Sequence, residues 1–308
     1  MVRIGNRRGT RCALLVGLLV AVGAPPVVHR AWADTAPRPP AETVVAAVGD
    51  VCGSACDQTA TLVAAMKPAA LILAGDNAYE SGSTTDYKKS YDPHYGKFKS
   101  LTYPAPGNHE YKTSGAGGYF AYFGDRAGKK GEGFYSFDVG DWHFVALNSN
   151  ISTAGTSPQV SWLKRDLAAN SKPCTAAYWH HPRFSGSEHG DQKQVTPLYQ
   201  ALYDAKADLV IVGHDHNYQR FAPSAPDGKR DDANGIRELV IGTGGRGTYG
   251  VNSRTAAVRE VANATTMGVG KLTLSATGYR FDFVPVAGRT FTDTVSGRCH
   301  RAAGPTPR

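Results

Sequence analysis

The chain has 308 residues, and its 34 Lys and Arg against 26 Asp and Glu give a formal net charge of +8. Five of the arginines lie in the first 33 residues, where no acidic residue occurs, so subtracting these five charges from +8 leaves +3 for the rest of the chain. The remaining Lys and Arg are scattered and form no stripe, which argues against a nucleic-acid-binding protein.

Residues 1–33 have the order of a secretory signal peptide: a basic start, the apolar run ALLVGLLVAVGA, and Ala-Trp-Ala at 31–33. The apolar run is too short to span a bilayer comfortably, so we predict no membrane anchor. The pair Arg7 and Arg8 leaves twin-arginine export open beside the general route. We therefore expect a secreted protein that is cleaved after Ala33.

The rest of the chain, about 275 residues, fits one large α/β domain. We expect a Pro-rich linker at 34–43, a single catalytic domain at 44–300 and a flexible tail at 301–308. Short apolar runs alternate with helical patterns. The predicted strands are 43–49, 69–75, 143–148, 175–180, 209–213, 238–242, 270–276 and 279–286. The predicted helices lie near 57–67, 85–99, 158–170 and 194–205.

Four cysteines lie beyond the signal segment: Cys52, Cys56, Cys174 and Cys299. An even number in an exported protein favours two disulfides. Three connectivities are possible, and the short spacing of Cys52 and Cys56 favours that local pair, with Cys174 bonded to Cys299. A zinc thiolate site is the alternative, although no second Cys-x-x-Cys accompanies the first pair.

Polar side chains follow five of the apolar runs at the point where each run ends. In an open α/β sheet, the ligand site lies beyond the carboxyl ends of the strands. Oxygen and imidazole donors without thiolate suit zinc, iron or manganese. Each group alone could be a helix cap, a turn or a packing residue, but five in succession predict a metal site. The groups are GD (49–50), GDNAY (75–79), GNHE (107–110), WHHP (179–182) and GHDH (213–216).

In this order, the five groups resemble the motifs of the calcineurin-like metallophosphoesterases, and in particular the purple acid phosphatase branch, which reads GD, GDxxY, GNHE, VxxH and GHxH. The first motif here lacks the histidine that many relatives carry two residues after Asp50, as does the purple acid phosphatase branch, which uses a tyrosine that matches Tyr79. The fourth motif begins with Ala177 in place of valine. The resemblance implies a four-layer α/β/β/α fold with two packed mixed sheets.

The resemblance also implies a binuclear metal site. Asp50, Asp76, Tyr79 and His216 would hold the first ion, which would be Fe(III) because a phenolate is a hard anionic ligand. The second ion would be divalent Zn, Mn or Fe, held by Asn108, His180 and His214, and Asp76 would bridge the two ions. Because Pro182 follows the adjacent histidines 180 and 181, we assign His180 as the ligand and expect His181 to point to the opposite side.

The implied activity is hydrolysis of phosphate monoesters by a metal-bound hydroxide. His109 is the candidate proton donor to the leaving group, and His189 is a second candidate that contacts the phosphate or donates a proton. The predicted partner is a small phosphorylated substrate. One alternative is a phosphodiesterase that acts on nucleotides or phospholipid headgroups with the same site. Another is an exported phosphate- or metal-binding protein without turnover.

One Gly-rich stretch, GTGGRG at 242–247, fits the dinucleotide-binding pattern and follows a predicted strand. The residues after it are polar and rich in Gly and Asn, so no helix is expected there to receive a pyrophosphate. We interpret the stretch as a loop near the metal site.

Overall fold

The structure is a computed structural model that describes residues 42–255 and 257–302. The predicted signal peptide and nearly all of the predicted linker lie outside the described residues, as does the end of the predicted tail. None of the helices in the described part combines the length and the apolar character that a membrane span needs.

The first sheet has six strands, and its three neighbouring strands β1, β2 and β3 are parallel. The other three strands follow one another in the C-terminal part of the chain and pair antiparallel, with β11 joined to β1. In spatial order the strands are β13 (Asp293–Arg298), β12 (Gly278–Pro285), β11 (Gly268–Ser275), β1 (Thr43–Val48), β2 (Ala70–Ala74) and β3 (Thr102–Ala105).

The second sheet has seven strands, of which the central four, β5, β6, β7 and β9, are parallel. Strands β4, β8 and β10 pair antiparallel with their neighbours. In spatial order the strands are β10 (Arg259–Asn263), β8 (Tyr218–Phe221), β9 (Arg237–Ile241), β7 (Leu209–Val212), β6 (Cys174–Tyr178), β5 (Trp142–Ala146) and β4 (Tyr135–Val139).

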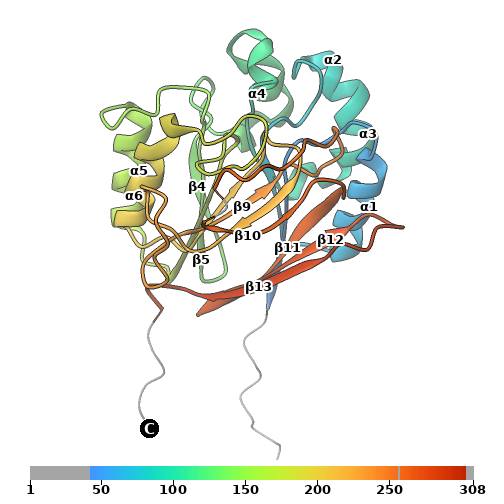
Figure 1. Cartoon of the computed structure of the whole chain (residues 1–308). Coiled ribbons are helices and arrows are strands. Elements are labelled where there is room, and N and C mark those ends of the chain that lie inside the picture. Colours follow the sequence, from blue (N-terminus) through green and yellow to red (C-terminus); the bar gives the residue numbers. More distant parts are fainter. Residues whose placement is uncertain (1–41, 256, 303–308) are drawn as a thin grey trace, which may run out of the picture. The chain divides into compact units, whose positions relative to one another are not determined.

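The two sheets pack face to face, and helices cover their outer faces. One apolar core, with Phe144 and Ile211 from the second sheet and Phe281 from the first, fills the space between the sheets. Helices α1 (Cys56–Met66) and α4 (Gly117–Phe123) pack on the first sheet. Helices α5 (Pro158–Ala169) and α6 (Thr196–Asp204) pack on the second, on the opposite side of the molecule (Figure 1). The predicted four-layer fold is confirmed.

The predicted helix near 85–99 is present, but it is not a uniform α-helix. Residues 84–101 are helical without a break, in the order α2 (Thr84–Asp86), a π-helical turn (Tyr87–Tyr91), α3 (Asp92–Tyr95) and a 3-10 turn (Gly96–Leu101). Ser83 and Asp86 form a capping box at its start. The buried rings of Tyr87, Tyr91 and Tyr95 set the course of the segment, because they fill a core with α4.

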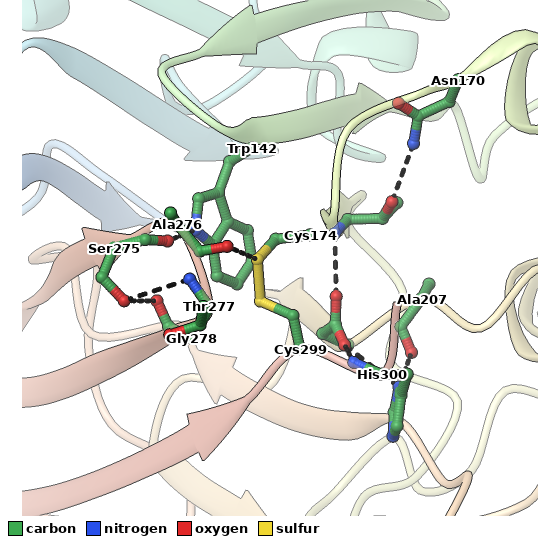
Figure 2. Close-up of a disulfide and its surroundings, with 12 residues drawn as sticks. Trp142, Asn170, Cys174, Ala207, Ser275, Ala276, Thr277, Gly278, Cys299 and His300 are labelled. Carbon is green, nitrogen blue, oxygen red and sulfur yellow. Dashed lines mark hydrogen bonds and ion pairs between the residues drawn. A yellow bond between two sulfur atoms is a disulfide. The ribbon is translucent and has the colours of Figure 1, made fainter. Parts of the chain in front are cut away.

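Two disulfides join Cys52 to Cys56 and Cys174 to Cys299, the pairs favoured by the sequence. Figure 2 shows the second pair, which links the start of β6 to the residue after β13 and so connects the two sheets. Beside it, Trp142 of β5 donates a hydrogen bond of 2.9 Å to the Ser275 carbonyl of β11. Both links lie at the amino-terminal end of β6, away from the strand ends that carry the predicted ligands.

Candidate metal centre

The predicted ligands lie in the turns that follow β1, β2, β3, β6 and β7, at one end of the two sheets. Three of them have left-handed backbone conformations: φ is 58° at Asp50, 50° at Asp76 and 71° at His214. A residue with a Cβ atom rarely adopts this conformation, which costs about 1–2 kcal/mol relative to glycine. In each turn the chain reverses sharply after the strand.

The residues assigned to the first ion meet at the hydroxyl of Tyr79, which the other three surround. This oxygen lies 3.1 Å from Asp50 Oδ1, 3.2 Å from Asp76 Oδ2 and 3.3 Å from His216 Nε2. All four side chains are buried. Burial, followed by the charges of Asp50 and Asp76, raises the pKa of Tyr79 well above its ordinary value. The tyrosine therefore stays a neutral phenol unless a cation compensates its negative charge.

The residues assigned to the second ion meet at the side-chain oxygen of Asn108. This Oδ1 atom lies 2.9 Å from His180 Nε2 and 3.0 Å from His214 Nδ1. The two imidazole nitrogens are 3.2 Å apart, and Asp76 Oδ2 is 3.4 Å from His180 Nε2. Asp76 thus contacts members of both groups, which places it between the two sets of donors.

The hydrogen bonds around His180 show that these donors fit a cation. Its Nδ1 atom lies 2.9 Å from the Ala74 carbonyl and donates its hydrogen there. In the neutral ring, Nε2 then has only a lone pair, and it faces the lone pairs of Asn108 Oδ1 and Asp76 Oδ2. Donor atoms of Asp50, Asp76 and His180 all lie within 4.8 Å of one another and are buried. Converging lone pairs without hydrogens between them are the arrangement that a metal ion requires.

The charges in the site show what a cation would replace. Burial opposes ionisation of Asp76, but His180 and His109 outweigh it and hold the pKa of Asp76 below its usual range. Burial likewise opposes protonation of His180, but Asp76 outweighs it and raises the pKa of His180 to about 10. Without a metal, a proton on His180 thus balances the Asp76 carboxylate. A metal ion would take the place of that proton.

Glu110, the last residue of GNHE, holds two of the ligand turns together, a role that the sequence did not predict. Its buried carboxylate accepts hydrogen bonds from the backbone nitrogens of Asn77 (2.9 Å), Ala78 (3.2 Å) and Gly107 (2.7 Å). The turns approach so closely that a Cβ atom on Gly107 would lie 2.1 Å from Asp76 Oδ1. Gly107 therefore has to be glycine.

His109, the predicted proton donor, lies at the edge of the site. Its backbone nitrogen donates to Asp76 Oδ1 at 2.8 Å, and its ring Nδ1 donates to the Glu80 carbonyl at 2.7 Å. The second nitrogen, Nε2, therefore faces the site, 3.9 Å from Asp76 Oδ2. The ring also contacts Tyr79 edge to face, with centroids 4.5 Å apart.

His189, the second candidate, is positioned by the aspartate within GHDH. Its ring Nδ1 lies 2.8 Å from Asp215 Oδ1, and this hydrogen bond raises the pKa of His189. Asp215 is fully buried and also accepts a hydrogen bond from Ser185. The half-exposed His189 ring lies 4.1 Å from the His214 ring. The sequence indicated the histidine, but it did not assign Asp215 this role.

The expected orientation of His181 is wrong. Its ring lies 4.4 Å from the His214 ring and 5.1 Å from the His180 ring, so both adjacent histidines face the site. A bend of the chain at these residues removes the alternation that a strand would impose. The Ser149 hydroxyl fixes the ring through its Nδ1 atom at 2.8 Å. Burial and the neighbouring His180 lower the pKa of His181 to about 3, so the ring is neutral.

Comparison with known proteins agrees with the fold and identifies the family. The calcineurin-like phosphoesterase family matches residues 43–218, which is more than half of the chain. Purple acid phosphatase 23 of Arabidopsis thaliana is 28% identical over 216 residues, which are 57% of this chain and 47% of that protein. Purple acid phosphatase 21 of the same plant is 35% identical over 118 residues, 36% of this chain and 26% of that protein. The chain thus spans about half the length, or less, of the curated relatives it matches.

Two solved structures share the fold at low sequence identity. Purple acid phosphatase PPD1 from yellow lupin (Lupinus luteus) seeds superposes with a TM-score of 0.76 at 16% identity, over 88% of this chain and 58% of that one. GAP50, described as the anchor in the inner membrane complex of Plasmodium, superposes with a TM-score of 0.61 at 14% identity, over 82% of this chain and 88% of that one.

Proposed function

The chain belongs to the calcineurin-like phosphoesterase family, and we propose that it is a secreted phosphatase that hydrolyses phosphate monoesters with two metal ions. The observation that carries this proposal is the position of Asp76, which lies between the two groups of donors. It is 3.2 Å from the Tyr79 hydroxyl and 3.4 Å from His180 Nε2. A carboxylate in this position can bridge two ions, and paired ions are the usual device for displacement at phosphorus.

In this proposal the first ion is held by Asp50, Asp76, Tyr79 and His216, and the second by Asp76, Asn108, His180 and His214. The phenol of Tyr79 favours Fe(III) in the first position, while imidazole and amide ligands suit divalent Zn, Mn or Fe in the second. When bound, two such ions lower the pKa of a water molecule and neutralise charge on the phosphoryl group.

The remaining side chains would handle protons and orient the substrate. His109 would donate a proton from Nε2 to the leaving oxygen, because its Nδ1 hydrogen is held by the Glu80 carbonyl. His189 would contact a phosphate oxygen, since the buried Asp215 favours its protonated form. Glu110 keeps the Asp76 and Asn108 turns at a fixed separation through its three backbone hydrogen bonds.

Export and domain organisation are part of the same proposal. The two disulfides suit an oxidising compartment, and residues 1–33 would be removed as a signal peptide. The catalytic domain would then comprise residues 44–300 between a short linker and a short tail. Purification from the culture medium should yield a protein whose first residue is Asp34, whereas an intact N-terminus would contradict the export proposal.

One metal-loaded sample tests the activity. We expect turnover of 4-nitrophenyl phosphate and, at matched concentrations, at least about tenfold slower turnover of bis(4-nitrophenyl) phosphate. A faster diester reaction would reassign the site to phosphodiester hydrolysis. Stoichiometric metal without turnover of either substrate would indicate a binding protein.

A further inference from the structure

The proposed proton donor fixes where a leaving group must lie. The leaving oxygen has to come within hydrogen-bond reach of His109 Nε2, so the rest of the alcohol or phenol lies against the side chains around His109. Tyr79, whose ring is 4.5 Å from the His109 ring, and the cation Lys112 both contact His109. A second cation, Arg246, lies over the Tyr79 ring. The inference below rests on the proposed function.

The Gly-rich loop 242–247 carries one of these cations to the site. The backbone nitrogen of Gly244 donates to the Gly49 carbonyl at 2.9 Å, and that of Arg246 donates to the Asp50 carbonyl at 3.2 Å. A Cβ atom on Gly244 would lie 2.4 Å from the Gly49 oxygen, so only glycine permits this approach. Because the loop is bonded to the ligand turn itself, the position of the Arg246 backbone is fixed relative to Asp50.

The guanidinium of Arg246 lies over the Tyr79 ring, 4.7 Å from its centroid, and Nη2 lies 2.5 Å from Glu80 Oε1. Glu80 is 62% exposed and Arg246 is 35% exposed. Exposed ion pairs are weak because water screens them. An anion that arrives on a substrate can therefore displace the Glu80 carboxylate from Arg246.

The ammonium of Lys112 lies on the His109 ring, 3.2 Å from Nε2 and 3.0 Å from Nδ1. Within the described part of the chain, Lys112 pairs with no carboxylate, and its side chain is exposed. The two cations thus flank the adjoining rings of Tyr79 and His109, with Arg246 on Tyr79 and Lys112 on His109. Glu80 is the carboxylate that pairs with Arg246.

We propose that Arg246 and Lys112 form a subsite for an anionic substituent on the leaving group. The preferred substrates are then phosphate monoesters whose alcohol or phenol carries a carboxylate or a second phosphate. Both cations can donate charge-assisted hydrogen bonds to such a group, and the planar fork of Arg246 can bind it in bidentate fashion.

A matched set of substrates tests the subsite. Phenyl phosphate is compared with 3- and 4-carboxyphenyl phosphate, and the measured quantity is the ratio of kcat/KM for the better carboxylated isomer to that for phenyl phosphate. Arg246→Gln and Lys112→Gln should each lower this ratio by about tenfold, the usual effect of one charge-assisted hydrogen bond. Glu80→Gln should raise it by about threefold, because it removes the competing carboxylate.

Matched controls remove a cation far from the site. Arg165→Gln and Lys164→Gln change exposed residues of α5 on the outer face of the second sheet, and they should leave the ratio unchanged. A readout without turnover uses the metal-loaded protein with benzylphosphonate and 4-carboxybenzylphosphonate. Calorimetry should show that Arg246→Gln weakens the binding of 4-carboxybenzylphosphonate about tenfold more than the binding of benzylphosphonate.

The outcomes separate this inference from the proposed function. An unchanged ratio and unchanged relative binding in Arg246→Gln and Lys112→Gln would overturn the subsite while phosphatase activity remained. A fall of the ratio in Glu80→Gln would also contradict it. If the metal-loaded wild type hydrolysed no monoester, the proposed function would fail first.

Discussion

His180 Nε2 and Asn108 Oδ1 lie 2.9 Å apart although neither atom carries a hydrogen when His180 is neutral, because its Nδ1 hydrogen is donated to the Ala74 carbonyl. Two lone pairs that face each other in a buried site repel unless a cation or a proton lies between them. Asn108→Leu removes one of them at nearly constant volume. We expect the wild type to bind two ions per chain and this variant one, by elemental analysis after dialysis.

Thermal unfolding provides the second readout for Asn108. Metal that binds the folded state should raise the unfolding temperature of the wild type and raise that of Asn108→Leu less. Without metal, the variant should be less stable than the wild type by about 1–3 kcal/mol at neutral pH, because the protonated Nε2 of His180 loses Asn108 Oδ1 as an acceptor. Asn234→Leu, far from the site, is the control. Equal stability of the two metal-free proteins, or metal that raised both unfolding temperatures equally, would contradict this account.

His109 and Asp76 should respond differently to substitution. His109→Ala should keep its metals and lose about a hundred- to ten-thousandfold in kcat, the usual contribution of a general acid. The loss should shrink for 4-nitrophenyl phosphate, whose leaving group needs no proton. Asp76→Ala should lose metal, because Asp76 contacts both donor groups. Metal loss in His109→Ala with metal retained in Asp76→Ala would reverse the assignments.

Tyr79 gives a spectroscopic test. Burial and the carboxylates of Asp50 and Asp76 raise the pKa of its phenol, so metal-free protein should show no phenolate absorption at neutral pH. With Fe(III) bound, a coordinated phenolate transfers charge to the ion, and the protein should be purple or pink. Tyr79→Phe should lose the visible band and keep part of the activity. An active, iron-loaded wild type without colour would remove Tyr79 from the ligands.

From the two disulfides we expect a low content of free thiols and a contribution to the free energy of unfolding. Thiol titration of the exported protein under denaturing, non-reducing conditions should give a value near zero. Cys174 and Cys299 are 125 residues apart, and a closed loop of this order stabilises a fold by about 4–5 kcal/mol in the chain-entropy treatment. Replacing both by Ala should lower the free energy of unfolding by up to this amount. Replacing Cys52 and Cys56 should cost less, since their sequence separation is only 4.

His143 lies away from the metal site, and its surroundings lead us to expect that the free energy of unfolding depends on pH. Its ring lies between two carboxylates, 2.8 Å from Asp138 Oδ1 and 2.9 Å from Asp166 Oδ2. Burial opposes protonation, but the two carboxylates outweigh it and raise the pKa of His143. A raised pKa stabilises the folded state fully below the unfolded value of about 6.5, and this contribution is lost as the pH rises through the folded pKa.

The stability that His143→Gln loses relative to the wild type should therefore be largest at acidic pH. The difference in the free energy of unfolding should be constant below about pH 6.5 and shrink above it, by at most about 1.4 kcal/mol per pH unit. Denaturant titrations of both proteins across this range measure it. A difference that grew with pH would mean that the charged form of His143 is not the stabilising one.

Four of the five strands that carry the predicted ligands were predictable, because each is a short, apolar run with a polar residue at its end. The buried strands β1, β2, β6 and β7 were all predicted within two residues of their ends. The edge strands β4, β10 and β13 were missed, because their partly exposed residues give little apolar contrast. Strands β3 and β8 were missed because each has only four residues, and β3 also contains a proline. Helix α4 was missed for another reason, since it is rich in Gly and aromatic residues.

The residues that support the site were harder to predict than the candidate ligands. Glu110, Asp215 and Ser149 act through hydrogen bonds to groups up to 33 residues away, and no local pattern reveals such partners. The orientation of His181 depends on a bend of the chain at that position, so alternation along a strand predicted the wrong side. The type of a residue can indicate its chemistry, whereas its partner depends on the folded chain.

The left-handed backbone at Asp50, Asp76 and His214 limits how far this protein can be stabilised by engineering. Substituting glycine at such positions is a standard way to relieve backbone strain. Here the same substitution would delete a side chain of the proposed metal centre, so the strain and the ligand cannot be separated. Thermostable variants of this scaffold should therefore draw their gains from the sheets, helices and outer loops. The three turns should resist optimisation for as long as activity is selected.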